Sequence, residues 1–244
     1  MIVLCIYMNI SFFQKYDTQY IKKRYGSEYD GGYVLANGLQ YDLFISCGID
    51  DNITFENHFL KCHDVPCKAF DGTIRNIPDG ADPKIEFIKK NIGDVESDHM
   101  TTLVNYLEKH KNVFLKMDIE TWEFFWFDMI PEKLLNNISQ MVIEIHFPWT
   151  LSENIFESRS RVMEVSKKMD VLRKMMKYHN MIHIHGNSAC GAVNVNNKML
   201  PNVVECTFLH KKHDPNATVS NTLNPDSKLD NPNFPNQKEL EFIL

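Results

Sequence analysis

Short apolar runs alternate with longer amphipathic stretches along most of the chain after residue 25. Seven runs rich in Val, Ile and Phe predict strands, at 42–46, 67–70, 84–87, 113–117, 141–145, 181–185 and 203–209. Amphipathic stretches between them predict helices, at 54–63, 101–111 and 157–179. In the last of these, apolar residues recur three or four positions apart and so share one helix face. This alternation predicts an α/β fold built on a largely parallel sheet.

The two ends of the chain differ from this pattern. The apolar opening MIVLCIYMNISFF is shorter than the roughly 20 residues of a membrane span and lacks the basic start and cleavage site of a signal peptide. We expect residues 1–29 to form an N-terminal extension that packs on the core, with a trimmed membrane anchor as the alternative. Residues 213–244 are rich in Pro and Asn and predict an irregular tail. The main domain is then expected at 30–212.

The charge balance of the chain indicates which binding partners to expect. The chain has 26 Lys and Arg against 32 Asp and Glu, a formal net charge of -6, and no basic stretch. Binding to nucleic acid rests on clustered Lys and Arg, so the charge balance disfavours a general nucleic-acid binder, and we expect no nucleic-acid partner. Without a clear targeting segment or a stable membrane span, we expect a soluble cytoplasmic protein. The sequence leaves its oligomeric state open.

Polar residues are concentrated where the predicted strands end. In an open parallel sheet, ligands bind in the crevice at the carboxyl ends of the strands. Gly48 follows the first of these strands and would let a ligand approach the backbone, and Asp71 at the end of the second would suit the two hydroxyls of a ribose. Each alone could be part of a plain turn. Together, on successive strands, they favour a ligand that contains a nucleoside.

Three further strand ends carry polar residues two positions apart, which point to the same side of an extended chain. The pairs are Asp118 with Glu120, Glu144 with His146, and His183 with His185. A cluster of carboxylates and imidazoles could supply a general base or hold a divalent cation. The expected metal ligands are Asp118, Glu144, His146 and His185. The alternative is a buried hydrogen-bonded network, or side chains that face solvent.

The segment LKMDIETWE at 115–123 carries the most specific motif of the chain. It resembles the LKIDVEGAE-type segment of the FkbM-like family of S-adenosylmethionine-dependent methyltransferases. It is accompanied, in the expected order, by DGGYVL at 30–35, SCGIDDNITFE at 46–56, VIEIH at 142–146 and LPNVVECTFL at 200–209. The chain departs from the family at Ser46, where an acidic residue is usual, and at Asp50 and Thr121, where glycines are usual.

The resemblance implies a Rossmann-like open, mostly parallel sheet of about seven strands with helices on both faces. It also implies S-adenosylmethionine as cofactor, with Gly48 near its methionine part and Asp71 on its ribose. Asp50 and Asp118 complete the expected cofactor contacts, and Asp118 and Glu120 would border the reaction centre. The implied activity is transfer of a methyl group to a hydroxyl of a sugar or other small molecule, a form of glycan modification.

A hydroxyl is a poor nucleophile at neutral pH, so the reaction needs a base or a metal. The expected catalytic residues are His146, Asp118 and Glu120, with His146 as the preferred base. A divalent cation such as Mg²⁺, held by Asp118, Glu144 and their neighbours, would be the other means of activation. Two rival functions stay open. One is a metal-dependent hydrolase or sugar-modifying enzyme on the same sheet, and the other is a catalytically silent binding protein that has lost the cofactor loop.

Overall fold

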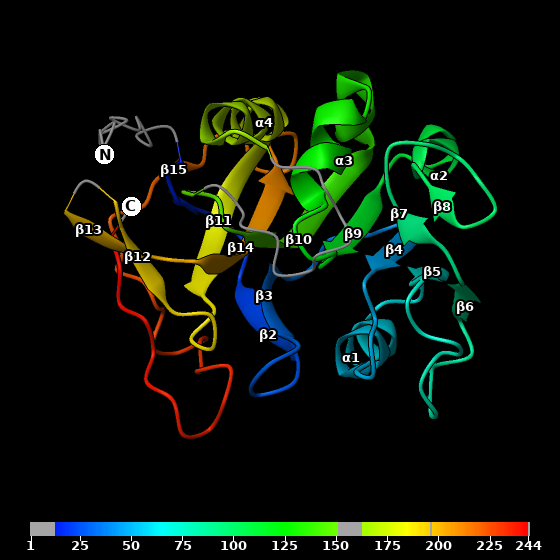
Figure 1. Ribbon diagram of the computed structural model, residues 1–244, viewed down its shortest axis with the longest axis horizontal. Helices are drawn as coiled ribbons and strands as arrows, with labels where there is room; N and C mark the ends of the chain where they lie inside the picture. Colours follow the sequence, from blue (N-terminus) through cyan, green and yellow to red (C-terminus); the bar gives the residue numbers. More distant parts are fainter. Residues whose placement is uncertain (1–12, 151–162, 196, 244) are drawn as a thin grey trace, which may run out of the picture.

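A mixed seven-stranded sheet forms the centre of the molecule (Figure 1). The computed structural model describes residues 13–150, 163–195 and 197–243. The strands of the sheet are β4 (Leu43–Cys47), β5 (Cys67–Phe70), β6 (Ile85–Ile88), β9 (Val113–Met117), β10 (Ile138–His146), β11 (His179–Gly186) and β14 (Val203–His210), in the spatial order β11-β14-β10-β9-β4-β5-β6. The strands from β10 to β6 are parallel, whereas β14 runs antiparallel to both β10 and β11. The expected Rossmann-like, mostly parallel sheet is confirmed.

Side chains alternate between two cores, one on each face of the sheet. In β4, Leu43 and Ile45 belong to the core beneath α2 (Val104–Lys109), α3 (Glu123–Met129) and α4 (Val165–Tyr178). Phe44 belongs to the other core, with α1 (Thr54–Cys62) and the hairpin of β2 (Lys22–Gly26) and β3 (Gly32–Ala36). Figure 1 shows these two layers above and below the sheet. The helices on both faces are therefore confirmed, with the hairpin sharing one face with α1.

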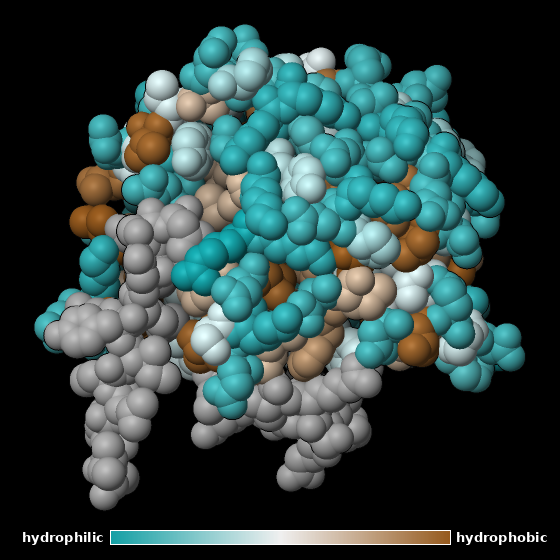
Figure 2. All heavy atoms as spheres, turned by 90° about the horizontal axis from the view of Figure 1, so that it is seen from above, coloured by the Kyte–Doolittle hydropathy of each residue, from teal (hydrophilic) through white to brown (hydrophobic). Residues whose placement is uncertain are grey.

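The outer surfaces of the layers are mostly polar. Seen from the side of α2, α3 and α4, hydrophilic residues cover most of the face, and hydrophobic ones are scattered among them (Figure 2). Within the described ranges, no helix combines the length and apolar character that crossing a membrane requires. Short elements complete the fold: β1 (Tyr16–Asp17) with β15 (Thr218–Val219), β7 (Asn91–Ile92) with β8 (Met100–Thr101), β12 (Ala192–Val195) with β13 (Lys198–Pro201), and the 3-10 helix η1 (Glu132–Asn137).

The predicted elements are present with small changes of length. All seven strands occur, and β10 extends furthest beyond its prediction because it begins at Ile138. The helix predicted at 101–111 is shorter, since Thr101 pairs with Ile92 and Leu103 has a left-handed φ of 63°. The helix predicted at 157–179 is α4, and 157–162 lie outside the described residues. Neither α3 nor β2 was predicted.

The C-terminal tail lies against β11 through polar side chains. His183 Nε2 is 2.8 Å from Asp230 Oδ1, and His185 Nε2 is 2.9 Å from Glu239 Oε2. Both histidines are at most 2% exposed. They were expected to face the crevice with the other strand ends, but here they anchor the tail. The division of the chain at residues 29 and 212 stays a prediction.

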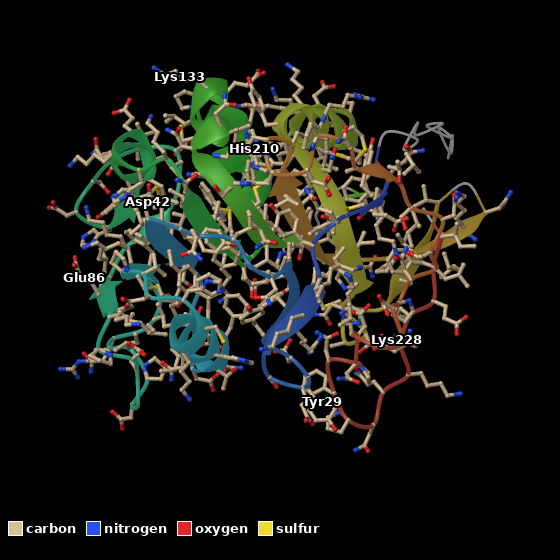
Figure 3. All side chains as sticks on the ribbon, turned by 180° about the vertical axis from the view of Figure 1, so that it is seen from behind. Tyr29, Asp42, Glu86, Lys133, His210 and Lys228 are labelled. Carbon is tan, nitrogen blue, oxygen red and sulfur yellow. The ribbon has the colours of Figure 1, made fainter. Side chains whose placement is uncertain are left out.

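The tail also contacts the turn of the β2–β3 hairpin. The backbone N–H of Asp30 donates to the carbonyl of Asn233 at 3.0 Å, and the Asn233 amide donates to Asp30 Oδ1 at 3.2 Å. Figure 3 shows Tyr29 in the hairpin turn and Lys228 of the tail on the same side of the molecule. The tail therefore holds the hairpin turn, whose Asp30 and Gly31 line the cavity described below.

One buried histidine links the stability of the fold to pH. His179 begins β11, is fully buried, and its Nε2 lies 2.9 Å from the carbonyl oxygen of Ile138. Burial lowers its pKa from 6.5 to about 3; the bond to Ile138 opposes this shift, and the nearby His210 adds to it. The unfolded chain therefore binds a proton at a higher pH than the folded chain does.

We expect the His179 contribution to stability to be fully present above about pH 6.5 and to be lost as the pH falls from there toward about 3. The variant His179→Phe keeps a ring in the core but cannot titrate, so its stability should fall less over this range. Urea unfolding at several pH values measures the difference. His99→Gln, at an exposed position, is the control. If the free energy of unfolding fell equally with pH in the wild type and in His179→Phe, this assignment would be contradicted.

Candidate functional site

A cavity of about 820 Å³ lies at the carboxyl ends of β4, β5, β9 and β10. The chain leaves β4 toward β5 on one side, whereas β9 lies on the other side of β4. This point, where the strand order reverses, is the usual ligand site of open α/β sheets. The loop 48–52 after β4, Asp71 after β5 and the loop 118–122 after β9 line the cavity, together with side chains of β10.

Gly48 allows two of these loops to meet. Its φ is 80°, and a Cβ built on it would lie 1.7 Å from the carbonyl oxygen of Asp118. The Asp118 backbone N–H also donates to the carbonyl of Cys47 at 3.0 Å. A side chain at position 48 would therefore collide with the neighbouring loop, whether or not a ligand is bound. The expected role of Gly48 as a cofactor contact stays a prediction, and the structure adds a packing reason for the glycine.

Asp71 holds the loop after β4 in place. Its Oδ2 accepts hydrogen bonds from the backbone N–H groups of Ile49 at 2.9 Å and Asp50 at 3.0 Å. Its Oδ1 accepts from the N–H and the hydroxyl of Thr73 at 2.7 and 2.5 Å. Burial would raise the pKa of Asp71, but the bonds from Thr73, Asp50 and Ile49 outweigh it and lower the pKa. Both carboxylate oxygens are thus occupied by the chain, and a ribose would have to share them.

A buried ion pair beneath this loop was missed by the sequence reasoning. Lys116 of β9 donates to the carbonyl of Gly48 at 2.6 Å and lies 3.3 Å from Glu56 Oε1 of α1. The hydroxyl of Ser46 donates to the same Glu56 oxygen at 2.6 Å. Burial would lower the pKa of Lys116, but the charges of Glu56 and Asp118 and the contact with Glu56 together outweigh burial and raise the pKa. Glu56, ten residues after Ser46, thus places a buried carboxylate beside the end of β4.

The loop after β9 turns sharply into the cavity. Glu120 has a φ of 54° and Thr121 a φ of 75°, so two successive residues adopt the left-handed conformation. For a β-branched residue such as threonine this conformation costs roughly 1–2 kcal/mol. The turn lets α3 begin at Glu123, which brings that buried carboxylate back toward β10. The glycine that the FkbM-like family has at position 121 would adopt this conformation without strain.

Glu123 fixes the imidazole of His146. One oxygen, Oε1, lies 2.6 Å from His146 Nδ1 and accepts the backbone N–H of His146 at 2.9 Å. Burial would lower the pKa of His146, but Glu123, with help from Glu144 and Asp118, raises it to about 10. Glu123 thus fixes the position of the ring and favours its protonated form in the ligand-free protein. The expected role of His146 as the catalytic base stays a prediction.

Three of the expected site residues lie close enough to share one ligand. Asp118, Glu120 and His146 each place one potential ligand atom within 4.8 Å of the other two. Among the described residues, these three form the group of acidic and histidine side chains close enough to hold one metal ion. Glu144 lines the same cavity, is 7% exposed, and accepts a hydrogen bond from the Asn187 amide at 2.8 Å. Burial, followed by the Asp118 charge, raises its pKa well above the ordinary value.

His185 does not join this cluster. Its Nδ1 lies 3.0 Å from Glu205 and its Nε2 lies 2.9 Å from Glu239, so both nitrogens are occupied. The reason is the position of β14, which separates β11 from β10. Two inter-strand spacings place the ends of β10 and β11 roughly 10 Å apart. Of the four expected metal ligands, Asp118 and His146 therefore lie in the group with ligand geometry, together with Glu120, whereas His185 and Glu144 do not belong to that group.

The cavity is strongly anionic. The acidic residues that line it are Asp30, Asp50, Asp51, Asp71, Asp118, Glu120 and Glu144. Two lysines also line it, Lys90 and Lys116, and Lys116 is already paired with Glu56. Such a lining attracts cations and opposes phosphates. The fold and the cavity together define a Rossmann-like α/β protein with an acidic ligand site at the switch point of its sheet.

Comparisons with known proteins give distant likenesses. No family model matches the sequence, and no curated protein matches it. A protein titled "Putative hemolysin from Streptococcus thermophilus" aligns with a TM-score of 0.39 and 13% identity, over 70% of this chain and 61% of its own. The antibiotic-resistance methyltransferase Kmr aligns with a TM-score of 0.36 and 11% identity, over 70% of this chain and 88% of its own. The chain thus spans less than two thirds of the first of these proteins.

The geometry at Gly48 gives a prediction with an internal control. Gly48→Ala should destabilise the protein by more than Gly38→Ala, since Gly38 has a φ of 98° but nothing within 4 Å of a built Cβ. The left-handed backbone alone costs roughly 1–2 kcal/mol in each variant. The collision with Asp118 adds to this cost at position 48 only. Denaturant unfolding measures both, and equal losses would show that the two loops do not meet as described.

Proposed function

We propose that the chain is an S-adenosylmethionine-dependent methyltransferase. The observation that carries the proposal is the anionic cavity at the switch point of the sheet. S-adenosylmethionine has a sulfonium and an ammonium group, and both are cations that carboxylates attract. The segments that resemble the FkbM-like family form this cavity, including loop 48–52 and loop 118–122. This agreement between the resemblance and the charge supports the proposal.

The cavity fits this cofactor better than it fits a dinucleotide. Its volume of about 820 Å³ is within the range of sites for small molecules and cofactors, roughly 300–1,000 Å³. A dinucleotide would bring a pyrophosphate against Asp50, Asp51 and Asp118, where like charges repel it. We assign loop 48–50 to the methionine part of the cofactor, Asp71 to the ribose side, and Asp118 to the region of the sulfonium.

The proposed acceptor is a hydroxyl of a sugar or another small molecule. Trp122, Asn187 and Asp30 line the same cavity, and an aromatic face beside amide and carboxylate groups suits a polyhydroxylated ligand. The bound cofactor supplies the methyl group: the acceptor oxygen forms a bond to the methyl carbon as the carbon–sulfur bond breaks. The acceptor proton must then leave the oxygen.

The chain offers carboxylates for this proton. Glu120 Oε2 lies 3.5 Å from His146 Nε2, and the Glu120 side chain is 62% exposed at the mouth of the cavity. We assign acceptance of this proton to Glu120 or Asp118, and the positioning of Glu120 to His146, whose Nε2 faces it.

The first experiment is calorimetric titration of the full chain with S-adenosylmethionine, S-adenosylhomocysteine and NAD. We expect the two adenosyl ligands to bind and NAD not to bind. Asp118→Asn should weaken binding of S-adenosylmethionine by about 10-fold, equivalent to about 1.4 kcal/mol. It should weaken binding of S-adenosylhomocysteine less, because that ligand has an uncharged sulfur.

Asp64→Asn is the matched control, because Asp64 is exposed and lies outside the cavity lining. It removes the same charge and should leave both affinities unchanged. A folded protein that binds neither adenosyl ligand would refute the proposal. If Asp118→Asn weakened the affinities for both adenosyl ligands equally, Asp118 would not lie beside the sulfonium.

A further inference from the structure

We propose that Asp118, Glu120 and His146 bind a divalent cation, with Mn²⁺ as the best match, and that this cation holds a hydroxyl oxygen of the acceptor. The proposal deepens the proposed function, because it concerns the acceptor side of the same cavity. Binding of the cation itself needs no methyl donor. The two proposals can therefore fail separately.

The distances suit a single ion. A cation about 2.1–2.4 Å from each ligand atom allows opposite ligands to lie up to about 4.8 Å apart. The ligand atoms of Asp118, Glu120 and His146 lie within 4.8 Å of one another. They come from two elements, loop 118–122 and the end of β10, and the backbone needs no rearrangement to bring them together.

The orientation of His146 is a second and independent observation. The side chain is 8% exposed, and Glu123 binds both its Nδ1 and its backbone N–H through one oxygen. This arrangement directs Nε2 toward Glu120 Oε2, 3.5 Å away. Histidines that bind metals usually donate their other ring N–H to a carboxylate in this way, which fixes the ring and the tautomer. Glu123 is therefore a positioning residue for the proposed ion.

A buried carboxylate beside the cluster has an unused oxygen. Glu144 is 7% exposed and lines the cavity, and Asn187 occupies its Oε1. Among the described residues, no hydrogen bond reaches its Oε2. Its neighbours Asp118 and His146 are both members of the cluster. The Oε2 atom of Glu144 is therefore a further candidate ligand for the proposed cation.

The donor set indicates which cation to expect. Carboxylates and water suit Mg²⁺, Ca²⁺ and Mn²⁺, whereas imidazole suits the later first-row metals. Two carboxylates with one imidazole match Mn²⁺, which accepts oxygen-rich octahedral sites and also an imidazole nitrogen. Three protein ligands leave positions open toward the cavity, as in catalytic metal sites. An acceptor with one hydroxyl or two adjacent hydroxyls could fill them, and the cation would lower the pKa of a bound hydroxyl.

Electron paramagnetic resonance of free Mn²⁺ tests the proposal on the full chain after treatment with a chelator. We expect one saturable Mn²⁺ per chain. Glu120→Gln, in an exposed loop, should weaken binding by about 10-fold or more, because it removes a charged ligand. Glu123→Gln should weaken it by about 10- to 100-fold although Glu123 does not touch the ion, since it orients His146.

Asp51→Asn is the matched control, because it removes one negative charge from the same cavity but lies outside the cluster. It should change the Mn²⁺ affinity by less than about 2-fold if the three ligands bind the ion directly. Absence of saturable binding in the wild type would overturn the proposal. Equal weakening of Mn²⁺ binding by Glu120→Gln and Asp51→Asn would also overturn the proposal. The total negative charge of the cavity, rather than direct ligands, would then account for the binding.

The calorimetric titration with S-adenosylmethionine separates the two proposals. Cofactor binding without Mn²⁺ binding would refute the metal site and leave the proposed methyltransferase standing. Mn²⁺ binding without cofactor binding would support the metal site and favour the rival metal-dependent hydrolase or sugar-modifying enzyme. Circular dichroism of each variant checks that a lost affinity does not come from a lost fold.

Discussion

The ammonium group of Lys116 is the constraint on which the crevice depends. It lies under the loop after β4, bound to the carbonyl of Gly48 and paired with Glu56 of α1. A buried charge is costly unless its partners are close and well directed. Here the partners come from a strand, a loop and a helix, so meeting this requirement fixes all three relative to one another. These contacts therefore define the cavity floor before any ligand contributes.

Much of the fold could be predicted because its strands are short apolar runs between polar strand ends. The alternation within β4, where Phe44 faces one core and Ile45 the other, is local and visible in the sequence. By contrast, α3 was missed because its start, EFFWF, is aromatic at nearly every position and shows no period of 3.6. Tertiary packing decides the structure of such a segment.

The candidate site could be predicted only in part, for a geometric reason. Asp118, Glu120 and His146 follow neighbouring strands, and their meeting follows from the sheet alone. The separation of His185 depends on where β14 inserts, and no local pattern shows the spatial order of strands. Glu123 and Glu56 were missed because each acts through a partner far along the chain, and a single sequence does not record such pairs.

The single oxygen of Glu123 that binds both the backbone and the ring of His146 has a mechanical consequence. Glu123 is the first residue of α3, and α3 packs in the same core as α4. The direction of one imidazole nitrogen in the crevice is thus set by how a helix sits on the outer layer. A substitution in the contact between α3 and α4, far from the crevice, would therefore shift Glu123 and rotate the His146 ring.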